Sequence, residues 1–207
     1  NKGTNTSNHY FEDKGIRGIR FATDGMDERD AGYSDFTLAT DSEEGDCQEY
    51  WFRGNWRDHV ETYWREFASK QPLQNRRYET GIPDYKDTGM LCAVQDIGPG
   101  EKKEFHYILT WNVPNCNNYW SCLDISTSNI HYDVCDRTPW KNYYAVLFAD
   151  SGASASYGLE NRARLWEETK SFMDAVYNTT IPEETLDAVT ANLAILRSPT
   201  CLRLEDG

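Results

Sequence analysis

The feature that most constrains this chain is a change of hydrophobic period near Ser151. Before it, short runs rich in β-branched and aromatic residues alternate with turns, at residues 15–21, 35–40, 48–53, 91–97 and 102–111. After it, apolar residues recur every three or four positions, which is helical spacing. Strands followed by helices indicate segregated layers or domains. We therefore predict a mainly β domain over 1–150 and an α-helical segment over 151–207.

The clearest local pattern in the first part is a pair of strand-like runs around Gly98-Pro-Gly-Glu101. In the second run Phe105, Tyr107, Leu109 and Trp111 share one face at period two. A strand, a tight turn and a strand predict a β-hairpin. Several such runs with turns between them favour an antiparallel β-sandwich.

One helix interrupts these strands. Trp56, Val60, Tyr63, Trp64 and Phe67 fall at helical spacing, and Asn55 precedes them as a candidate N-cap. The remaining positions are largely charged and suit water. We predict a connecting helix whose apolar face packs against one sheet.

The C-terminal part reads as two helices. The first runs from 155 to 177 with Leu159, Ala163, Trp166, Met173 and Tyr177 along one stripe. Thr180 and Glu183 fit a capping box for the second, with Pro182 in its first turn. Leu186, Val189, Leu193 and Leu196 form the apolar face of that second helix. Two helices cannot bury both stripes by themselves, so we expect them to begin a larger helical domain that the end at Gly207 cuts through.

Charge and composition narrow the partners. The formal net charge of the 207-residue chain is −13, which repels phosphate backbones and anionic lipid heads. We expect no nucleic-acid partner and no transmembrane segment, because no apolar run is long enough. The compartment stays open, with the cytoplasm or a membrane periphery favoured over secretion. Seven Trp and thirteen Tyr suit sugar C–H edges, although core filling is the better explanation for any single ring.

No local motif identifies a catalytic residue. There is no G-x-S-x-G, P-loop or G-x-G-x-x-G pattern, and adjacent acids are common by chance in a chain with 34 of them. Cys116, Cys122, His131 and Cys135 match no common zinc signature, so we predict no metal site. Whether Cys116, Cys122 and Cys135 form a disulfide or stay as free thiols depends on the compartment.

The loop over 114–140 is the most unusual stretch, with Tyr119 and Trp120 in a polar, Asn-rich setting. Long loops at the end of strands often carry function. Tyr119 and Trp120 are therefore candidate substrate-binding residues that contact a sugar or an aglycone. The alternative is a lid that packs on its own domain.

Several segments resemble glycoside hydrolase family 116, the family of bile-acid β-glucosidase, also called non-lysosomal glucosylceramidase. Residues 105–115 resemble its strand and W-x-x-P-N turn, 97–101 its L-x-P-G-E turn, and 141–145 its NYYA segment. Residues 15–19 also fit. Residues 180–207 resemble most closely the family segment that runs from T-x-P-E to R-S-P-T-C and E-D-G.

The resemblance implies an N-terminal β-sandwich joined by helices to an (α/α)6 catalytic barrel. It implies a retaining β-glucosidase that acts on a β-glucoside, such as a glucosylated lipid, without a cofactor. Glu205-Asp206-Gly207 would lie just before the segment that carries the nucleophilic Glu, so we assign no catalytic residue within this chain. The remainder of the enzyme is then the expected partner. The alternative is a non-catalytic carbohydrate-binding or structural β-sandwich module.

Overall fold

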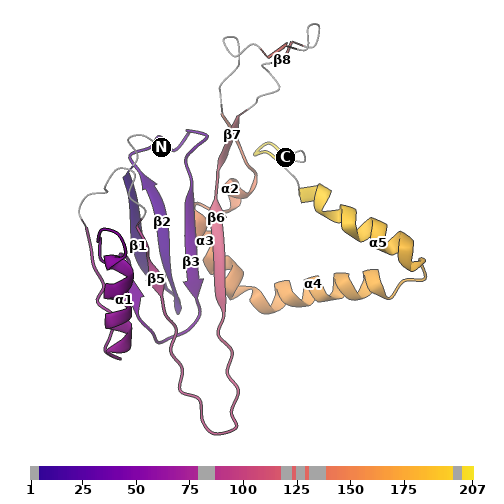
Figure 1. Ribbon diagram of the computed structural model, residues 1–207. Helices are drawn as coiled ribbons and strands as arrows, with labels where there is room; N and C mark the ends of the chain where they lie inside the picture. The colour runs from indigo at the N-terminus through magenta and orange to yellow at the C-terminus, as the bar shows by residue number, and fades with distance from the viewer. Residues whose placement is uncertain (1–4, 79–86, 118–122, 125–128, 131–138, 198–201) are drawn as a thin grey trace.

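The computed structural model describes residues 5–78, 87–117, 123–124, 129–130, 139–197 and 202–207. Its main feature is a four-stranded antiparallel sheet with C-terminal helices (Figure 1). In spatial order the strands are β1 (Asn5–Asp13), β2 (Ile16–Asp24), β3 (Asp35–Thr40) and β6 (Tyr107–Asn112). The predicted mainly β part followed by helices is thus confirmed.

A tight turn sets the register of the first two strands. Asp13 pairs with Ile16, which leaves Lys14 and Gly15 as a two-residue turn with φ angles of 50° and 79°. Positive φ at both central positions is the hairpin geometry that matches the twist of the flanking strands. The turn therefore fixes which β2 residues face each side of the sheet.

Helix α3 (Ser151–Glu160) covers one face of the sheet, behind β3 and β6 in Figure 1. Ala155 and Leu159 of the helix pack with Ile16 and Ala39, all of them at least nine-tenths buried. Phe11 and Ile108 pack around this cluster. Small residues on both sides let helix and sheet approach closely, so α3 and the sheet share one core.

Irregular chain covers the opposite face at β1 and β2. It includes the paired strands β4 (Cys47–Gln48) and β5 (Met90–Leu91). The buried Arg17 side chain donates hydrogen bonds to the carbonyl oxygens of Ser42, Gly45 and Cys92, at 2.9–3.2 Å. A buried guanidinium with these acceptors ties two distant loops to β2.

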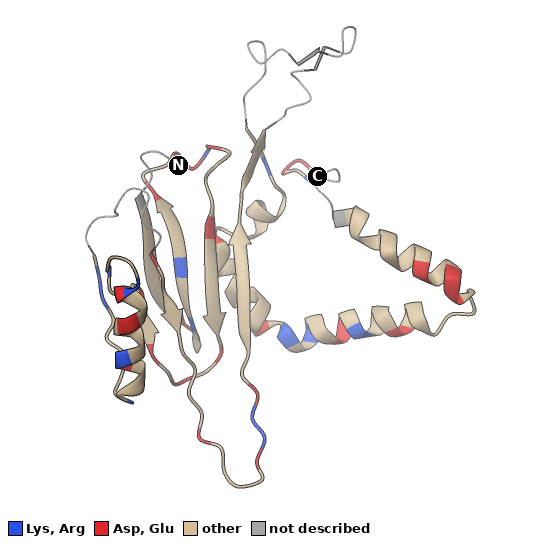
Figure 2. Ribbon diagram, viewed as in Figure 1, with Lys and Arg blue, Asp and Glu red and all other residues tan. Residues whose placement is uncertain are grey.

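The same face is open at β6. Tyr107, Leu109 and Trp111 are 47–68% exposed, while the alternate residues of the strand are turned toward α3. Figure 2 shows no acidic or basic residue along this edge strand. The predicted alternation is therefore present, but the aromatic side of the strand is the exposed one.

Two further strand pairs lie in the 114–141 region. β7 (Asn115–Asn117) pairs with β10 (Pro139–Lys141), and β8 (Leu123–Asp124) pairs with β9 (Asn129–Ile130). The short helix α2 (Tyr144–Leu147) follows β10 and leads into α3. β7 and β10 thus bring the two ends of the long loop together.

The last helices extend away from the sheet. α4 (Arg162–Tyr177) projects from the end of α3, and α5 (Glu183–Asn192) turns back toward the C-terminus before a 3₁₀ turn, Leu193–Arg197 (Figure 1). Trp166, Phe172 and Val189 are among their exposed apolar residues. No helix in the described part of the chain combines the length and apolar character needed to cross a bilayer.

Some local expectations are wrong. The turn at Gly98–Glu101 exists, since Glu101 N donates to Gly98 O at 3.0 Å, but its arms are not a strand pair. β5 pairs with β4 and β6 pairs with β3 instead. The charged run that follows Glu101 has no apolar face to bury, so the turn projects as a loop.

The helix boundaries also differ from those predicted. α1 (Asp58–Ala68) begins after Arg57 rather than Asn55, and Trp64 and Phe67 on it are exposed; only Tyr63 stacks closely on Trp51. The predicted helix over 155–177 is two helices, α3 and α4, that meet at Asn161.

The capping box at Thr180 does not form. α5 begins at Glu183, and Pro182 lies before it in an extended conformation with ψ of 143°. The residue pattern was suitable, but a helix that starts two residues later leaves the Thr180 hydroxyl out of reach of the first free N–H groups.

Candidate functional site

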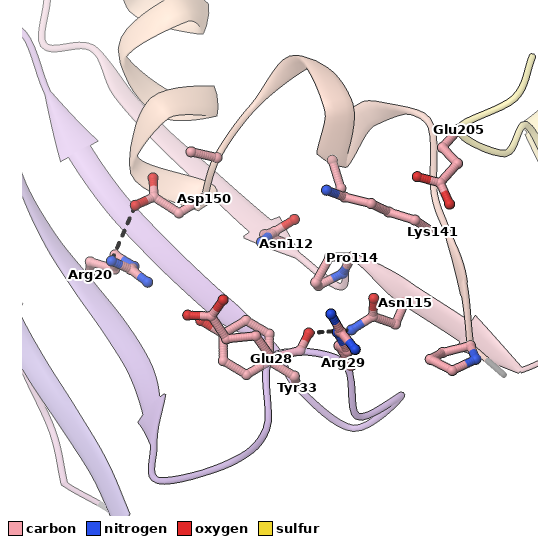
Figure 3. A pocket seen from close by; sticks show the side chains of 13 residues that line it. Arg20, Glu28, Arg29, Tyr33, Asn112, Pro114, Asn115, Lys141, Asp150 and Glu205 are labelled. Carbon is pink, nitrogen blue, oxygen red and sulfur yellow. Dashed lines mark hydrogen bonds and ion pairs between the residues drawn. The ribbon is translucent and has the colours of Figure 1, made fainter. Parts of the chain in front are cut away.

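A cavity of about 800 Å³ lies where β2, the β2–β3 loop, β7, β10 and the C-terminal segment meet (Figure 3). Its lining is unusually polar. The ionisable and amide side chains in it are Arg20, Glu28, Arg29, Tyr33, Asn112, Asn115, Lys141, Asp150 and Glu205. Cavities of this size with convergent polar groups are the usual place for a small-molecule ligand.

One wall is a buried charge network around Asp35. Its carboxylate accepts hydrogen bonds from Arg20 Nε at 2.9 Å, and from Ser151 N and Oγ at 3.0 and 2.5 Å. Arg20 Nη1 also lies 3.1 Å from Asp150 Oδ2, which Figure 3 shows at the cavity edge. Arg20 is thus fixed between two carboxylates and presents a rigid cation.

The pKa values at this wall favour the charged forms. Burial acts to raise the pKa of Asp35, but the hydrogen bonds from Ser151 and Asn112 and the charge of Arg20 outweigh it, so the pKa is lowered. Burial acts to lower the pKa of Arg20, but Asp150 and Asp35 raise it overall. The ion pair is therefore kept charged at neutral pH.

Asn112 supplies an unused acceptor. It is 4% exposed, and its Nδ2 donates to Asp35 Oδ1 at 2.9 Å. Its Oδ1 is buried and has no hydrogen-bond partner within the described part of the chain. In Figure 3 this side chain lies between Asp150 and Pro114 at the cavity. Leaving such an oxygen unpaired costs about 1–3 kcal/mol, so a donor at this position would be favourable.

The floor is the β2–β3 loop, held in place by Asn115. The Asn115 Nδ2 donates to the carbonyl oxygens of Glu28 and Asp30 at 2.7 and 3.0 Å. Tyr33, from the same loop, has a raised pKa because it is partly buried and near Glu28. Its hydroxyl therefore stays protonated at neutral pH and can donate a hydrogen bond.

The remaining wall joins two distant parts of the sequence. Glu205 N donates to Lys141 O at 3.0 Å, and Tyr143 N donates to Arg203 O at 2.9 Å. The Arg203 guanidinium lies 3.5 Å from the centroid of the Tyr143 ring. The C-terminal residues thereby run alongside β10, which brings Lys141 and Glu205 to the same side of the cavity (Figure 3).

Taken together, the lining offers cations, carboxylates, an amide oxygen and a phenol within one hollow. Such a lining can both donate and accept hydrogen bonds, and its positive and negative charges nearly cancel. These properties suit a neutral polyhydroxylated ligand. It does not by itself define a bond-breaking step.

Residues 1–165 match the family model described as beta-glucosidase 2, glycosyl-hydrolase family 116 N-term. The chain belongs to glycoside hydrolase family 116. The match spans the sheet, α3 and the first residues of α4. A search of curated proteins finds no match for this chain.

In this family 116 chain, two segments inside the family match and the C-terminal segment outside it meet at the cavity. The turn at 111–115 supplies Asn112 and Asn115, the NYYA-like segment at 141–145 supplies Lys141, and the C-terminal E-D-G supplies Glu205. These segments are far apart in sequence, so only the fold brings them together.

The structure leaves the predicted substrate-binding residues untested, because Tyr119 and Trp120 lie outside the described residues. The loop that carries them is nevertheless anchored at the cavity, since Pro114, Asn115 and Pro139 line it. Sequence reasoning missed the charged lining residues Arg20, Arg29 and Asp150. A signal existed only for Asp150, whose position before Ser151 suits an N-cap; its Oδ1 accepts from Ala153 N at 2.8 Å.

Two of the described cysteines, Cys47 and Cys116, are poorly suited to act as nucleophiles. Burial, followed by the charge of Glu49, raises the pKa of Cys47 to about 12, and burial raises that of Cys116. Both thiols are therefore protonated at neutral pH. Cys122, His131 and Cys135 lie outside the described residues, so the choice between a disulfide and free thiols stays open.

Proposed function

We propose that this family 116 chain is the N-terminal part of a retaining β-glucosidase and that the polar cavity faces its substrate. The observation that carries the proposal is that two segments inside the family match, 111–115 and 141–145, meet Glu205 of the C-terminal segment around one cavity. A neutral sugar matches a lining in which cations and carboxylates balance. Family membership itself establishes a glycoside hydrolase relationship, and the β-glucoside is the finer proposal.

The chemistry we propose needs two carboxyl groups about 5–5.5 Å apart, one as nucleophile and one as acid/base. By the family resemblance both lie beyond Gly207. The role of this chain is then to bind and orient the substrate, and to exclude water around it, without a cofactor. Remote contacts of this kind contribute to catalysis when they hold the sugar in a reactive position.

The architecture we propose is the β-sandwich followed by an (α/α)6 barrel. The exposed aromatic face of β6 supports a second sheet there, because a face of this size is rarely left open to water. The exposed apolar residues of α4 and α5 support further helices packing on them. The domain boundary near residue 150 belongs to this proposal as well.

The aglycone side of the substrate is proposed to meet the loop with Tyr119 and Trp120. This loop leaves the cavity through β7 and returns through β10. A glucosylated lipid would place an apolar group against such rings. A carbohydrate-binding or structural module is the alternative, and it requires no activity from the complete protein.

The direct test is an activity assay with an aryl β-glucoside. We expect no turnover by residues 1–207 alone and clear turnover by the complete enzyme, with β-glucose as the first product by NMR. Turnover by the chain alone that disappears when one of its own acids is substituted would refute the placement of the carboxylates. Release of α-glucose would refute retention.

A variant pair tests the cavity. Asn115→Ala removes the side chain that holds the β2–β3 loop under the cavity, and Asn117→Ala changes an exposed neighbour on the same strand that does not line it. In the complete enzyme we expect the first to raise KM about tenfold and the second to leave KM unchanged. Equal kinetics for both variants would remove the cavity from the substrate site.

A further inference from the structure

We propose a second saccharide-binding site, at the cavity of about 390 Å³ before α1. Trp51, Trp56, His59 and Asp87 line it, and it shares no lining residue with the larger cavity. The ligand class is a neutral sugar unit, such as one hexose of a glycan. This inference goes beyond the proposed hydrolysis, which does not depend on it.

The first observation is an aromatic ring held out in solvent. Trp56 is 97% exposed and has a φ of 57°, a left-handed conformation that bulky residues rarely adopt. Such a backbone costs of order 1–3 kcal/mol and is concentrated at functional positions. Both the exposure and the strain are unfavourable for stability alone, whereas a free ring face suits a ligand with C–H edges.

The second observation is that two residues lining the cavity each hold a buried polar atom without a hydrogen-bond partner in the described part of the chain. Trp51 Nε1 and His59 Nδ1 are both buried and lack hydrogen-bond partners among the described residues. The Trp51 ring is fixed by stacking on Tyr63, with centroids 4.4 Å apart and planes at 13°. The indole nitrogen can only donate, while the imidazole nitrogen can donate or accept according to its tautomer. Each atom would gain from a hydroxyl partner, which can donate and accept, if the two side chains shift when a ligand binds.

The third observation is that the charge in the cavity is neutralised. The Asp87 carboxylate receives hydrogen bonds from Arg53 Nε and Nη2, both at 2.8 Å, and both side chains are largely buried. The Arg53 guanidinium in turn lies 4.1 Å from the centroid of the Tyr78 ring. A paired carboxylate neither attracts a cation nor leaves Arg53 to bind an anion. A neutral ligand is therefore favoured over a phosphorylated one.

The test is a titration of the full chain with cellobiose, followed by tryptophan fluorescence and by saturation-transfer NMR. Trp56→Gly removes the ring and suits the left-handed backbone, so it should not lower the melting temperature. We expect it to weaken binding about tenfold. Trp64→Ala is the matched control, because Trp64 is an exposed ring on α1 that does not line the cavity. It should leave binding unchanged.

Several outcomes overturn the proposal. They are no saturation by about 50 mM cellobiose, unchanged affinity in Trp56→Gly, or an equal loss in Trp64→Ala. Tighter binding of glucose 6-phosphate than of glucose would reject the neutral ligand class. Protection of Trp56 only in the complete enzyme, without cellobiose binding, would show that polypeptide covers it instead. None of these results affects the hydrolysis assay, so the two proposals fail separately.

Discussion

Asp35 joins the sheet, helix α3 and the larger cavity through one carboxylate. It is 3% exposed and accepts from Arg20, Asn112 and Ser151. Ser151 is also fully buried and shares a 2.7 Å hydrogen bond with Thr37. The start of α3 is therefore positioned by polar contacts, while the rest of the helix is held by Ala155 and Leu159. The rigidity of Arg20 in the cavity follows from the same network.

Asp35→Asn should destabilise the chain by roughly 3 kcal/mol at pH 7, because an amide places donors against the N–H groups of Ser151 and Arg20. Urea unfolding at several pH values measures this. The folded pKa of Asp35 is lowered, so its stabilising effect is complete above its ordinary value of 3.8 and is lost as pH falls through the lower folded value. The gap between wild type and variant should therefore narrow below about pH 4.

The control for this pH effect is Asp24→Asn, at an exposed carboxylate on the end of β2. It should change stability by less than about 0.5 kcal/mol. A gap between wild type and Asp35→Asn that stays constant from pH 7 to pH 3 would contradict the role given to the Asp35 charge.

A second prediction at the scale of a residue concerns the contact that we propose between Trp120 and the substrate. Replacing it with Ala in the complete enzyme should mainly raise KM, with a loss of ~1 kcal/mol, because stacking on the aglycone helps ground state and transition state alike. Steady-state kinetics and thermal melting on the one variant measure both properties. A lower melting temperature with unchanged KM would mean that Trp120 only fixes its loop.

At the scale of elements, the sequence predicted the bounds of β3 and the alternation of side chains along β6, but not which face of β6 is exposed. The run at 35–40 is strand β3 to the residue, and the alternation in 102–111 is present in β6. Period two predicts that the two faces differ, but it does not say which face the chain itself covers. Here Ile108 lies against α3, and the more apolar face with Trp111 is exposed.

The two cavities could not be predicted because their residues are distant in sequence. Lys141 and Glu205 meet only because the C-terminal segment runs beside β10. In the smaller cavity Trp51 meets Thr88, whose carbonyl oxygen accepts a hydrogen bond from Trp51 N at 2.9 Å. Local patterns give periodicity and turns, whereas long-range contacts of this kind are set by tertiary packing.

The loop before β4 gives the element-scale prediction. At Gly45 an added Cβ would lie 1.8 Å from the carbonyl oxygen of Cys92, and φ is 144°. Gly45→Ala should therefore force apart the loops that Arg17 joins and cost roughly 4 kcal/mol in the free energy of unfolding. Gly15→Ala is the control, because its Cβ would meet no atom within 4 Å and only the positive φ opposes it.

For Gly15→Ala we expect a loss of about 1 kcal/mol, the cost of a left-handed conformation with a side chain. Urea unfolding of both variants gives the comparison. If the two glycines proved equally replaceable, the contact between the Gly45 and Cys92 loops would not be part of the folded state in solution.

At the scale of the whole molecule, the described chain leaves many large apolar side chains exposed to solvent. The exposed faces of β6, α4 and α5 carry Trp111, Trp166 and Val189 among others. α3 differs from α4 and α5 because the sheet buries it. The helical spacing of apolar residues in the sequence does not distinguish these helices. In the structure, residues of α3 are buried against the sheet, whereas apolar residues of α4 and α5 are exposed.

Residues 150–207 expressed alone should therefore be poorly folded or self-associated. The excised segment loses Ile16 and Ala39, which cover Ala155 and Leu159, in addition to whatever covers α4 and α5. Circular dichroism melting and analytical ultracentrifugation would test this. A monomeric peptide with a cooperative transition would count against α4 and α5 as the start of a larger helical domain.

The order of the strands also sets an order of folding. β1, β2 and β3 pair with their neighbours in sequence through short connections, but β6 reaches β3 only after 66 intervening residues, 41–106. Closing so long a loop carries an entropic cost before any contact is gained, and non-local pairing slows folding. On a ribosome the first three strands emerge well before their fourth strand and α3. Until then Ala39 and Ile16 stay uncovered, so this interval is when a nascent chain most needs protection from aggregation.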